Sequence, residues 1–584
     1  MTVLLDERAP RTLDELLREW ARPEHRGTRL EAWLFEDEAA RRGAEAALAE
    51  AGVAARVRSA YKPLVHAFLE EIDTSGLTRA RIRYPVHPEA DPLRFLSEAY
   101  PLAAMLDGVE TIFEFGEADL TYRVGLEYAD GRRAEHAVFA PNRLRGNHLD
   151  EVDLSPTGWL RATNRPNGAP DLDEPLDTEI EQVFHRAMAA LMAHEWPAQE
   201  PYAETIAIDV AIPGIERALA FGDEVMSTRE ALHEDFYFSL LEFFKRRCGR
   251  PPEDRSLQPG QIVPDIRAGE GDAHVRVTLR PFGEPQDPPR PEQDMERAEA
   301  APGLAQIHRE LAALPGEPFE GVSREGRPVR GLYRPGSRPA VLVTSGQHAN
   351  ETSAPVGSLR AMRRLLDKPE AHIAYIPVEN PDGYALHGRL CEANPRHMHH
   401  AARYTSLGND LEFGQDELVH EIGARNRALE LSGAQLHINL HGYPAHEWTR
   451  PFTGYLPRGF ELWSIPKGFF LIMRHHPSWA PAARTLIEAV TTGLSAVPGL
   501  AEFNRRQIEI CAIHSGGTPY EIINHVPCLI TAETRHPTPL TLITEFPDET
   551  IYGEAYRFAH TVQMATVIAA EEAFAAIMEA MAVA

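Results

Sequence analysis

The sequence lacks the features that mark several specialised classes of protein. Its 584 residues contain four cysteines (Cys248, Cys391, Cys511 and Cys528), and none stands in a CxxC-type spacing. A disulfide framework is therefore not expected, and a reducing cytoplasm is the simpler compartment. No apolar run approaches the roughly 18 to 20 residues of a membrane helix, and the N-terminus lacks a signal-peptide pattern.

An excess of positive charge is also missing. Lys and Arg number 59 against 87 Asp and Glu, which gives a net charge of −28. This balance argues against nucleic acid or an anionic membrane as the main partner. The hydrophobic content of 43% is ordinary for a globular protein, and the length suggests more than one domain.

The clearest boundary is a proline-rich stretch. Residues Pro281 to Asp294 contain five prolines and almost nothing apolar, so we expect a linker near residue 290. Residues 1–290 are predicted to form an α+β region of unknown role. It would contain a hairpin around Asp130-Gly131, a capping box at Thr12, and helices near 36–51, 178–194 and 227–247.

Three histidine-containing stretches resemble metal motifs without completing one. "LHEDF" at 232–236 and "HEWTR" at 446–450 lack a second His four residues after the first, since Tyr237 and Arg450 stand there. We expect both to be surface residues. "HMHH" at 397–400 has no fixed acidic or cysteine partner and is interpreted as non-ligand histidines near a polar cleft.

Residues 300–584 alternate between predicted strands and helices. Such alternation predicts an α/β fold with a mixed sheet flanked by helices, in which ligands bind beyond the carboxyl ends of the strands. The strands are expected at 340–344, 372–379, 435–441, 527–533 and 540–545, and the helices at 353–366, 416–431, 479–495 and 553–582.

Two of these strands end in residues that ligate metals. His348 and Glu351 follow the first strand, and His441 ends the strand in "QLHINLHGY". His437 lies four residues, or about 13 Å, behind His441 and is expected to be a core residue. Because catalytic zinc usually takes three protein ligands, His348, Glu351 and His441 are predicted to hold one metal ion.

Four motifs then occur in a familiar order. "SGQHANE", "ENPDGY" (379–384), "GNDLEF" (408–413) and "INLHGY" (438–443) resemble those of carboxypeptidase A-like zinc metallocarboxypeptidases, over residues 300–584. The resemblance implies one Zn²⁺ held by His348, Glu351 and His441. It implies hydrolysis of an amide bond in a peptide or an acylated amino acid.

The resemblance also implies a glutamate base at the end of the last strand, before a C-terminal helix. Glu545 fits that position best, and Glu533 is the alternative. Arg396, 14 residues before Asp410, stands near the position of the family's oxyanion arginine and is assigned that role. Its alternative is a surface arginine in a loop.

Some positions depart from the family. The substrate-binding Asn-Arg pair is replaced by Glu412-Phe413, and Ala512 stands where the mobile Tyr is expected. Asn350 stands before the predicted zinc ligand Glu351, where typical members of the family carry Arg. An Asn at this position resembles the related branch of succinylglutamate desuccinylase and aspartoacylase. Three functions therefore remain open: a peptidase, a deacylase of N-acyl amino acids and a non-catalytic zinc-binding module. In place of the missing arginine, the substrate carboxylate would be bound by Arg389, Arg403 or Arg450.

Overall fold

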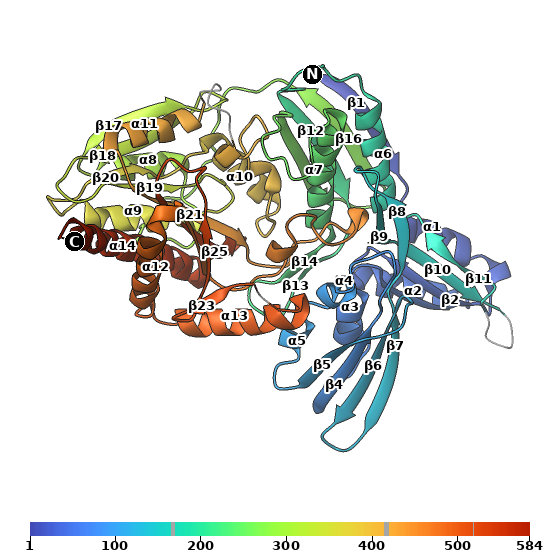
Figure 1. Cartoon of the computed structure of the whole chain (residues 1–584). Coiled ribbons are helices and arrows are strands. Elements are labelled where there is room, and N and C mark those ends of the chain that lie inside the picture. Colours follow the sequence, from blue (N-terminus) through green and yellow to red (C-terminus); the bar gives the residue numbers. More distant parts are fainter. Residues whose placement is uncertain (165–169, 414–419, 518, 584) are drawn as a thin grey trace.

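The computed structural model describes residues 1–164, 170–413, 420–517 and 519–583. The second half of the chain forms one large sheet with helices on both faces, and the first half forms several smaller sheets beside it (Figure 1). The predicted α/β fold with a mixed sheet is therefore confirmed. Among the described residues, no helix is long and apolar enough to cross a membrane.

The large sheet mixes parallel and antiparallel pairs. Its four central strands, β20, β19, β21 and β25, run parallel, and β22 pairs antiparallel with β25. The order across the described sheet is β17 (Glu317–Val322), β18 (Pro328–Arg334), β20 (Ile373–Ile376), β19 (Val341–Ser345), β21 (Leu436–Pro444), β25 (Leu540–Glu549), β22 (Phe470–His475), β24 (Val526–Ala532) and β23 (Glu521–Ile523).

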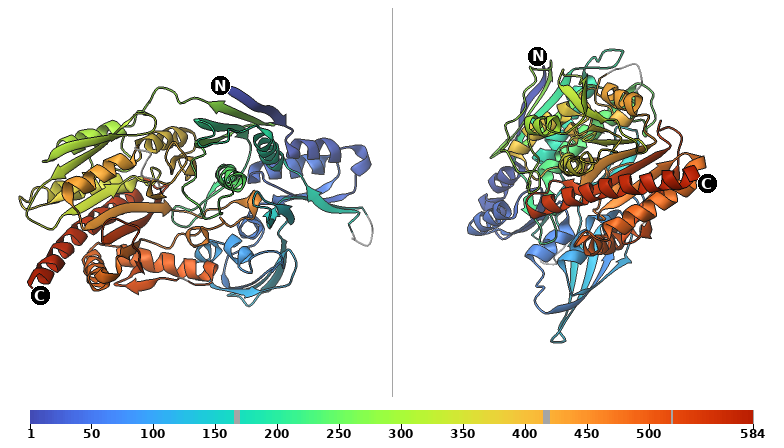
Figure 2. Two further views of the ribbon diagram at one scale, coloured as in Figure 1. Left: turned by 45° about the horizontal axis from the view of Figure 1, so that its top comes forward. Right: turned by 90° about the vertical axis from the view of Figure 1, so that its left-hand side faces the viewer.

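The central strands are buried on both faces, as parallel strands usually are. Val341 and Val343 pack on one side with α9 (Ser353–Leu365), α12 (Ala480–Leu494) and α14 (Glu554–Val583). Leu342 packs on the other side with α11 (Ile422–Ser432). Figure 2 shows α14, in red, beside α12. The second half also contains α8 (Leu304–Ala312), α10 (Pro381–Ala393) and α13 (Leu500–Ser515).

The first half contains three four-stranded sheets among its described residues. One is β1 (Thr2–Ala9), β16 (Ala273–Arg280), β12 (Thr205–Ile212) and β15 (Gln261–Ala268), packed with α6 (Glu179–Ala193) and α7 (Thr228–Arg247). The second sheet has the order β11 (Leu172–Leu176), β10 (Gly158–Thr163), β2 (Arg29–Leu34) and β3 (Ala54–Ser59). The third has the order β5 (Glu110–Phe115), β4 (Leu77–Tyr84), β6 (Thr121–Tyr128) and β7 (Arg133–Phe139).

The remaining described elements of the first half are short or border these sheets. The paired strands are β8 (Asn142–Gly146) with β9 (Val152–Pro156), and β13 (Glu216–Ala218) with β14 (Val225–Ser227). The helices are α1 (Thr12–Trp20), α2 (Glu38–Glu50), α3 (Pro63–Glu70), α4 (Arg94–Glu98) and α5 (Leu102–Met105).

Most of the helices and strands predicted from the sequence are present in the structure, with local differences between prediction and structure. The hairpin around Asp130-Gly131 is confirmed as β6 and β7. The capping box at Thr12 is wrong: the Thr12 hydroxyl accepts the backbone N–H of Glu179, and the capping box is formed by Thr178 and Glu181 at α6. The first residues of the helix predicted at 416–431 lie outside the described residues, and the described helix α11 starts at Ile422.

The two halves share a hydrophobic core. The ring of Phe238 in α7 packs tilted against Trp448 and in a T-shaped arrangement with Phe460, and Phe35 packs on Phe452. These aromatic side chains of both halves belong to one cluster of packed apolar residues. The proline-rich segment 281–294 joins the halves without helix or strand.

The contact between the halves also explains the two false metal motifs. The expectation that residues 232–236 and 446–450 lie on the surface is wrong, since His233, Glu234 and His446 are buried. His233 Nε2 lies 3.3 Å from the backbone nitrogen of Ala401, and His446 Nε2 lies 2.7 Å from Glu230 Oε1. These polar pairs join the halves inside the shared core.

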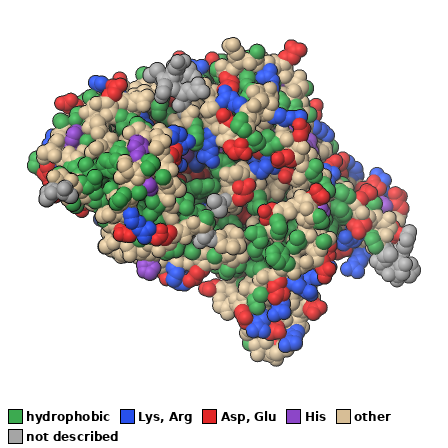
Figure 3. Space-filling view, viewed as in Figure 1, with side chains coloured by type: hydrophobic (Ala, Val, Ile, Leu, Met, Phe, Trp, Pro, Cys, Tyr) green, Lys and Arg blue, Asp and Glu red, His purple; other side chains and the backbone are tan. Residues whose placement is uncertain are grey.

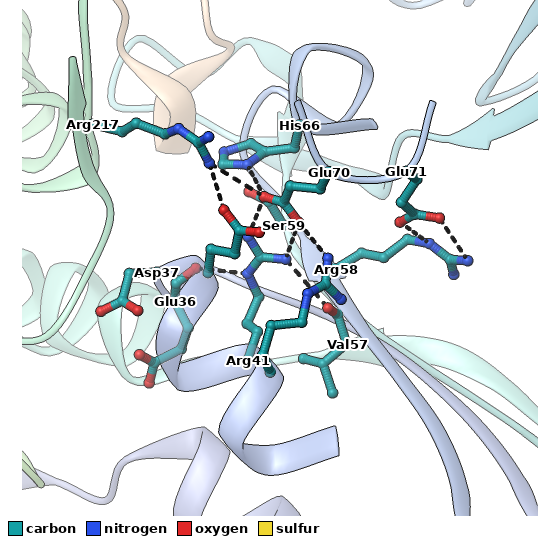
Figure 4. A network of polar contacts seen from close by, with 12 residues as sticks. Glu36, Asp37, Arg41, Val57, Arg58, Ser59, His66, Glu70, Glu71 and Arg217 are labelled. Atoms are coloured by element: carbon teal, nitrogen blue, oxygen red, sulfur yellow. Dashed lines mark hydrogen bonds and ion pairs between the residues drawn. The ribbon is translucent and has the colours of Figure 1, made fainter. Parts of the chain in front are cut away.

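A buried ion network supports the first half. Arg41 of α2 contacts both carboxylate oxygens of Glu70 at 2.6 and 2.9 Å, and His66 Nδ1 lies 2.7 Å from the same group (Figure 4). Burial would raise the pKa of Glu70, but these hydrogen bonds hold it below its usual range. The carboxylate therefore stays ionised and joins α2 to α3.

The sheet that contains β4–β7 forms a projecting lobe with charges of both signs interspersed on its surface (Figure 3). Arg79 of β4 pairs with Glu110 and Glu127 on the neighbouring strands, and Arg81 faces Glu114. The alternation of basic and apolar residues in β4 gives one face to the core and one to solvent.

The His446–Glu230 pair predicts how pH affects the contact between the halves. Burial would lower the pKa of His446, but the Glu230 carboxylate raises it to about 9. Because the folded pKa is above the unfolded value of about 6.5, the pair stabilises the fold fully below pH 6.5. This contribution, about 3 kcal/mol at most, disappears as the pH rises through 9.

We therefore expect His446→Gln to lower the urea midpoint most at pH 6, with the difference from wild type shrinking between pH 7 and 10. His274→Gln removes the largely exposed pair of His274 with Asp6, at 2.8 Å, and serves as the control with little effect. An H446Q deficit that stays constant from pH 6 to 10 would contradict the assignment.

Candidate metal centre

The predicted ligands converge at the carboxyl ends of two adjacent parallel strands. Ser345, at the end of β19, pairs with Leu440 of β21, so the residues after β19 lie beside His441. Gly346 allows the chain to turn there, with φ of +65° and the backbone of Val378 close to where a Cβ would stand. His348 and Glu351 follow this turn.

The three side chains place their ligand atoms around one point. His348 Nδ1 lies 3.0 Å from His441 Nδ1, and the two nitrogens lie 2.8 and 2.9 Å from the two oxygens of Glu351. All three residues are buried, and their ligand atoms lie within 4.8 Å of one another. Two imidazoles and a carboxylate form a donor set typical of catalytic zinc, so these residues fit the ion that the sequence predicts.

A second layer of polar residues orients the ligands. Asp410 Oδ1 lies 3.4 Å from His348 Nε2, and it accepts a hydrogen bond of 3.0 Å from Gln347 Nε2. The Gln347 carbonyl in turn accepts from Arg425 and Asn439. A carboxylate on the second ring nitrogen fixes the orientation and tautomer of a ligating histidine.

Arg403 is the cation beside the ligands. Its Nη1 donates to Glu351 Oε1 at 2.6 Å and lies 3.6 Å from Glu549. The guanidinium is largely buried and lines the same cavity as His348 and His441. The sequence indicated Arg403 only as one of three candidates to bind the substrate carboxylate. Its contact with Glu351 could not be predicted, because Arg403 lies in a loop whose path the motifs do not specify.

Glu545 faces the candidate metal centre. It pairs in register with His441 across β21 and β25, and its buried side chain lines the cavity. Burial and the nearby Glu351 carboxylate raise the pKa of Glu545 above its usual value. Glu533 lies after β24, pairs with Arg535 at 2.8 Å, and is not among the described residues that line this cavity.

The cavity beside the candidate ligands has a volume of about 240 Å³, and its described lining comes from the second half of the chain except for Arg255. Arg255, from the loop between α7 and β15, lines it together with residues of the large sheet. Arg255, Asp410 and Phe460 also line an adjoining cavity of about 350 Å³. His400 lines the first cavity and pairs with Glu234 of α7, as expected for a non-ligand histidine beside a cleft.

Arg396 lies elsewhere. Its Nη1 contacts Asp223 Oδ1 at 3.0 Å, its side chain is 45% exposed, and the guanidinium lies over the ring of Tyr552. The structure therefore does not bring Arg396 together with the three ligands. Its loop carries it toward the first half, a path that the distance of 14 residues from Asp410 could not indicate.

The other candidate residues are also separated from the cavity. Arg450 is buried against Glu242, and Arg389 lines a different groove, beside the proline-rich segment. Asn350 is buried, and its side-chain nitrogen donates to the carbonyl of Met398. Ala512 lies within α13. His437 is buried beside the Thr344 hydroxyl, as predicted for a core histidine.

No model of a known protein family and no curated protein matches the chain. Solved structures are similar to it at low identity. A metallo-carboxypeptidase from Pseudomonas aeruginosa is 16% identical (TM-score 0.30) over 52% of this chain and 73% of that one. A metallo-carboxypeptidase from Burkholderia cenocepacia is 15% identical (TM-score 0.29), with 52% and 76% covered. Carboxypeptidase A from Helicoverpa armigera is 12% identical (TM-score 0.29), with 58% and 94% covered.

The donor set predicts metal content. We expect about one zinc per chain in the purified protein, and less than one tenth of that in His348→Ala or His441→Ala, because each removes one of three protein ligands. Elemental analysis after dialysis measures it. The matched control is His25→Ala, which alters the exposed group of Glu19, Glu24 and His25 and should leave the zinc content unchanged.

Equal zinc in H348A, H441A and wild type, or a loss only in H25A, would contradict the assignment.

Proposed function

We propose that the protein is a zinc-dependent hydrolase of amide bonds, acting as a carboxypeptidase-like peptidase. One observation carries the proposal: Glu545 faces the same cavity as a buried His348, Glu351 and His441 donor set. A metal-binding module without catalysis would not need a buried carboxylate on the neighbouring strand opposite one ligand.

Zinc in a site with three protein ligands activates water and polarises a carbonyl group. The proposed roles of the chain's own residues follow from their positions. Glu545 accepts a proton from the attacking water and transfers it to the leaving nitrogen. Its burial keeps the carboxylate away from bulk solvent, and its place on β25 fixes its direction toward the cavity.

Arg403 takes the role that the sequence assigned to Arg396. Its largely buried guanidinium lies beside Glu351 and lines the cavity, within reach of the negative charge that would develop on a bound carbonyl oxygen during attack. A fixed cation at that point stabilises the transition state more than the ground state. Arg396 cannot do so from its pair with Asp223.

The cavity wall fits the side chain of an amino acid residue. Ile472 and Ile543, paired across β22 and β25, give an apolar floor, and Tyr443, Trp448 and Trp463 add aromatic surface. The adjoining cavity of about 350 Å³ leaves room for a substrate that extends beyond the scissile bond. This extension favours a peptide.

A deacylase of N-acyl amino acids is the second candidate. It is favoured by the size of the first cavity, about 240 Å³. Both functions use the same base and the same ligands, and they differ in how far the substrate reaches.

Glu545→Gln should bind zinc as wild type does and lose turnover by about 10²- to 10⁴-fold, because the proton acceptor is gone while the ligands remain. Hydrolysis of peptides and N-acyl amino acids of increasing length, with and without a chelator, measures it and separates the two candidates. Glu533→Gln is the matched control and should remain active. Loss of turnover in E533Q with an active E545Q would reverse the assignment.

Arg403→Gln should lower kcat by about 10²- to 10³-fold, because one cation aimed at the developing charge is removed. Arg396→Gln should leave kcat within about twofold of wild type, since it breaks only a half-exposed ion pair. Steady-state kinetics on the best substrate of the screen compares them. A larger effect of R396Q than of R403Q would restore the role that the sequence assigned.

A further inference from the structure

Arg255 is an arginine of the cleft without an acidic partner among the described residues. It lines both adjoining cavities, yet within residues 1–164, 170–413, 420–517 and 519–583 it forms no hydrogen bond or ion pair. Its only described interactions of this kind are with aromatic rings: the guanidinium lies 4.8 Å from the ring centre of Phe460 and 5.7 Å from that of Phe413. A half-buried arginine whose described contacts are with aromatic rings keeps its N–H donors available to a ligand.

Three other arginines near the candidate ligands already have acidic partners. Arg403 binds Glu351, and Arg425 binds Glu379 at 2.8 Å. Arg474 lines the first cavity but lies 3.3 Å from Glu412 and 3.4 Å from Glu533. Each of these arginines is therefore paired with an acid, whereas Arg255 forms no ion pair in the described part of the chain.

The position of Arg255 is as informative as its lack of a partner. The guanidinium of Arg255 lies over the ring of Phe413, three residues after Asp410. A loop of the first half thus places a guanidinium beside the segment of the second half that contacts His348. Asp410, a partner of His348, lines the same two cavities as Arg255.

We propose that Arg255 binds a carboxylate of the substrate, and that the first half of the chain thereby determines substrate specificity. This inference rests on the proposed hydrolase function, because it names the group that positions the substrate at that site. A planar guanidinium pairs with a carboxylate through two parallel hydrogen bonds. With Glu412 and Glu545 also on the cavity wall, a singly charged carboxylate suits the site better than a dianionic phosphate.

Arg535 provides the matched control. Its guanidinium lies 4.4 Å from the same Phe413 ring, but it pairs with Glu533 and is not among the described residues that line either cavity. Replacing it removes a cation of the same kind from the same ring without removing the proposed anchor.

The test compares N-acetyl dipeptides that have a free C-terminal carboxylate with their C-terminal amides. Wild type and Arg535→Gln should prefer the free acid, measured by kcat/KM. Arg255→Gln should raise KM for the acid at least 20-fold, leave kcat within about threefold, and lose the preference over the amide. Arg255→Lys should recover part of the affinity, because it restores charge without the bidentate geometry.

Calorimetry on the zinc-loaded Glu545→Gln protein separates this inference from the proposed function. If the free acid binds more tightly than the amide and Arg255→Gln removes the difference, Arg255 is the anchor even if no peptide is hydrolysed. If the acid and amide bind equally, or if R255Q changes neither binding nor KM while hydrolysis persists, the inference is wrong and the hydrolase assignment stands.

Discussion

The candidate site depends on the parallel pairing of β19 with β21. Because these neighbouring strands run in the same direction, their carboxyl ends lie at one edge of the sheet, and the turn after β19 meets the end of β21 there. His348, Glu351 and His441 are brought together by this pairing, although about 90 residues separate the first two from the third. β25, parallel to β21, adds Glu545 opposite His441.

The first half of the chain packs against the second half and contacts residues near the candidate site. Its α7 contributes Glu234 to His400 and Glu230 to His446, and its aromatic side chains share a core with Trp448. The loop after α7 brings Arg255 to the cleft. One hydrophobic cluster therefore spans both halves, beside other clusters that lie within a single half.

The sequence was most informative where local pattern and position coincide. The apolar run of β19 and the alternation in "QLHINLHGY" predicted the strands and the residues at their ends, so the three candidate ligands could be named. Glu545 was chosen as the candidate base from its place before the C-terminal helix. The contacts of Arg403 and Arg255 could not be predicted, because both residues lie in loops whose paths are determined by packing against the other half. The buried histidines at 233 and 446 were misplaced for the same reason: a helix or loop residue next to a glutamate appears exposed until the surface that covers it is known.

The central claim is that two imidazoles and one carboxylate of this chain bind a catalytic zinc ion. X-ray absorption at the zinc edge of the purified, dialysed protein tests it most directly. The spectrum should show a first shell of nitrogen and oxygen only, at about 2.0 to 2.2 Å, with outer-shell scattering from two imidazole rings. A sulfur shell near 2.3 Å, or a spectrum without imidazole scattering, would contradict it.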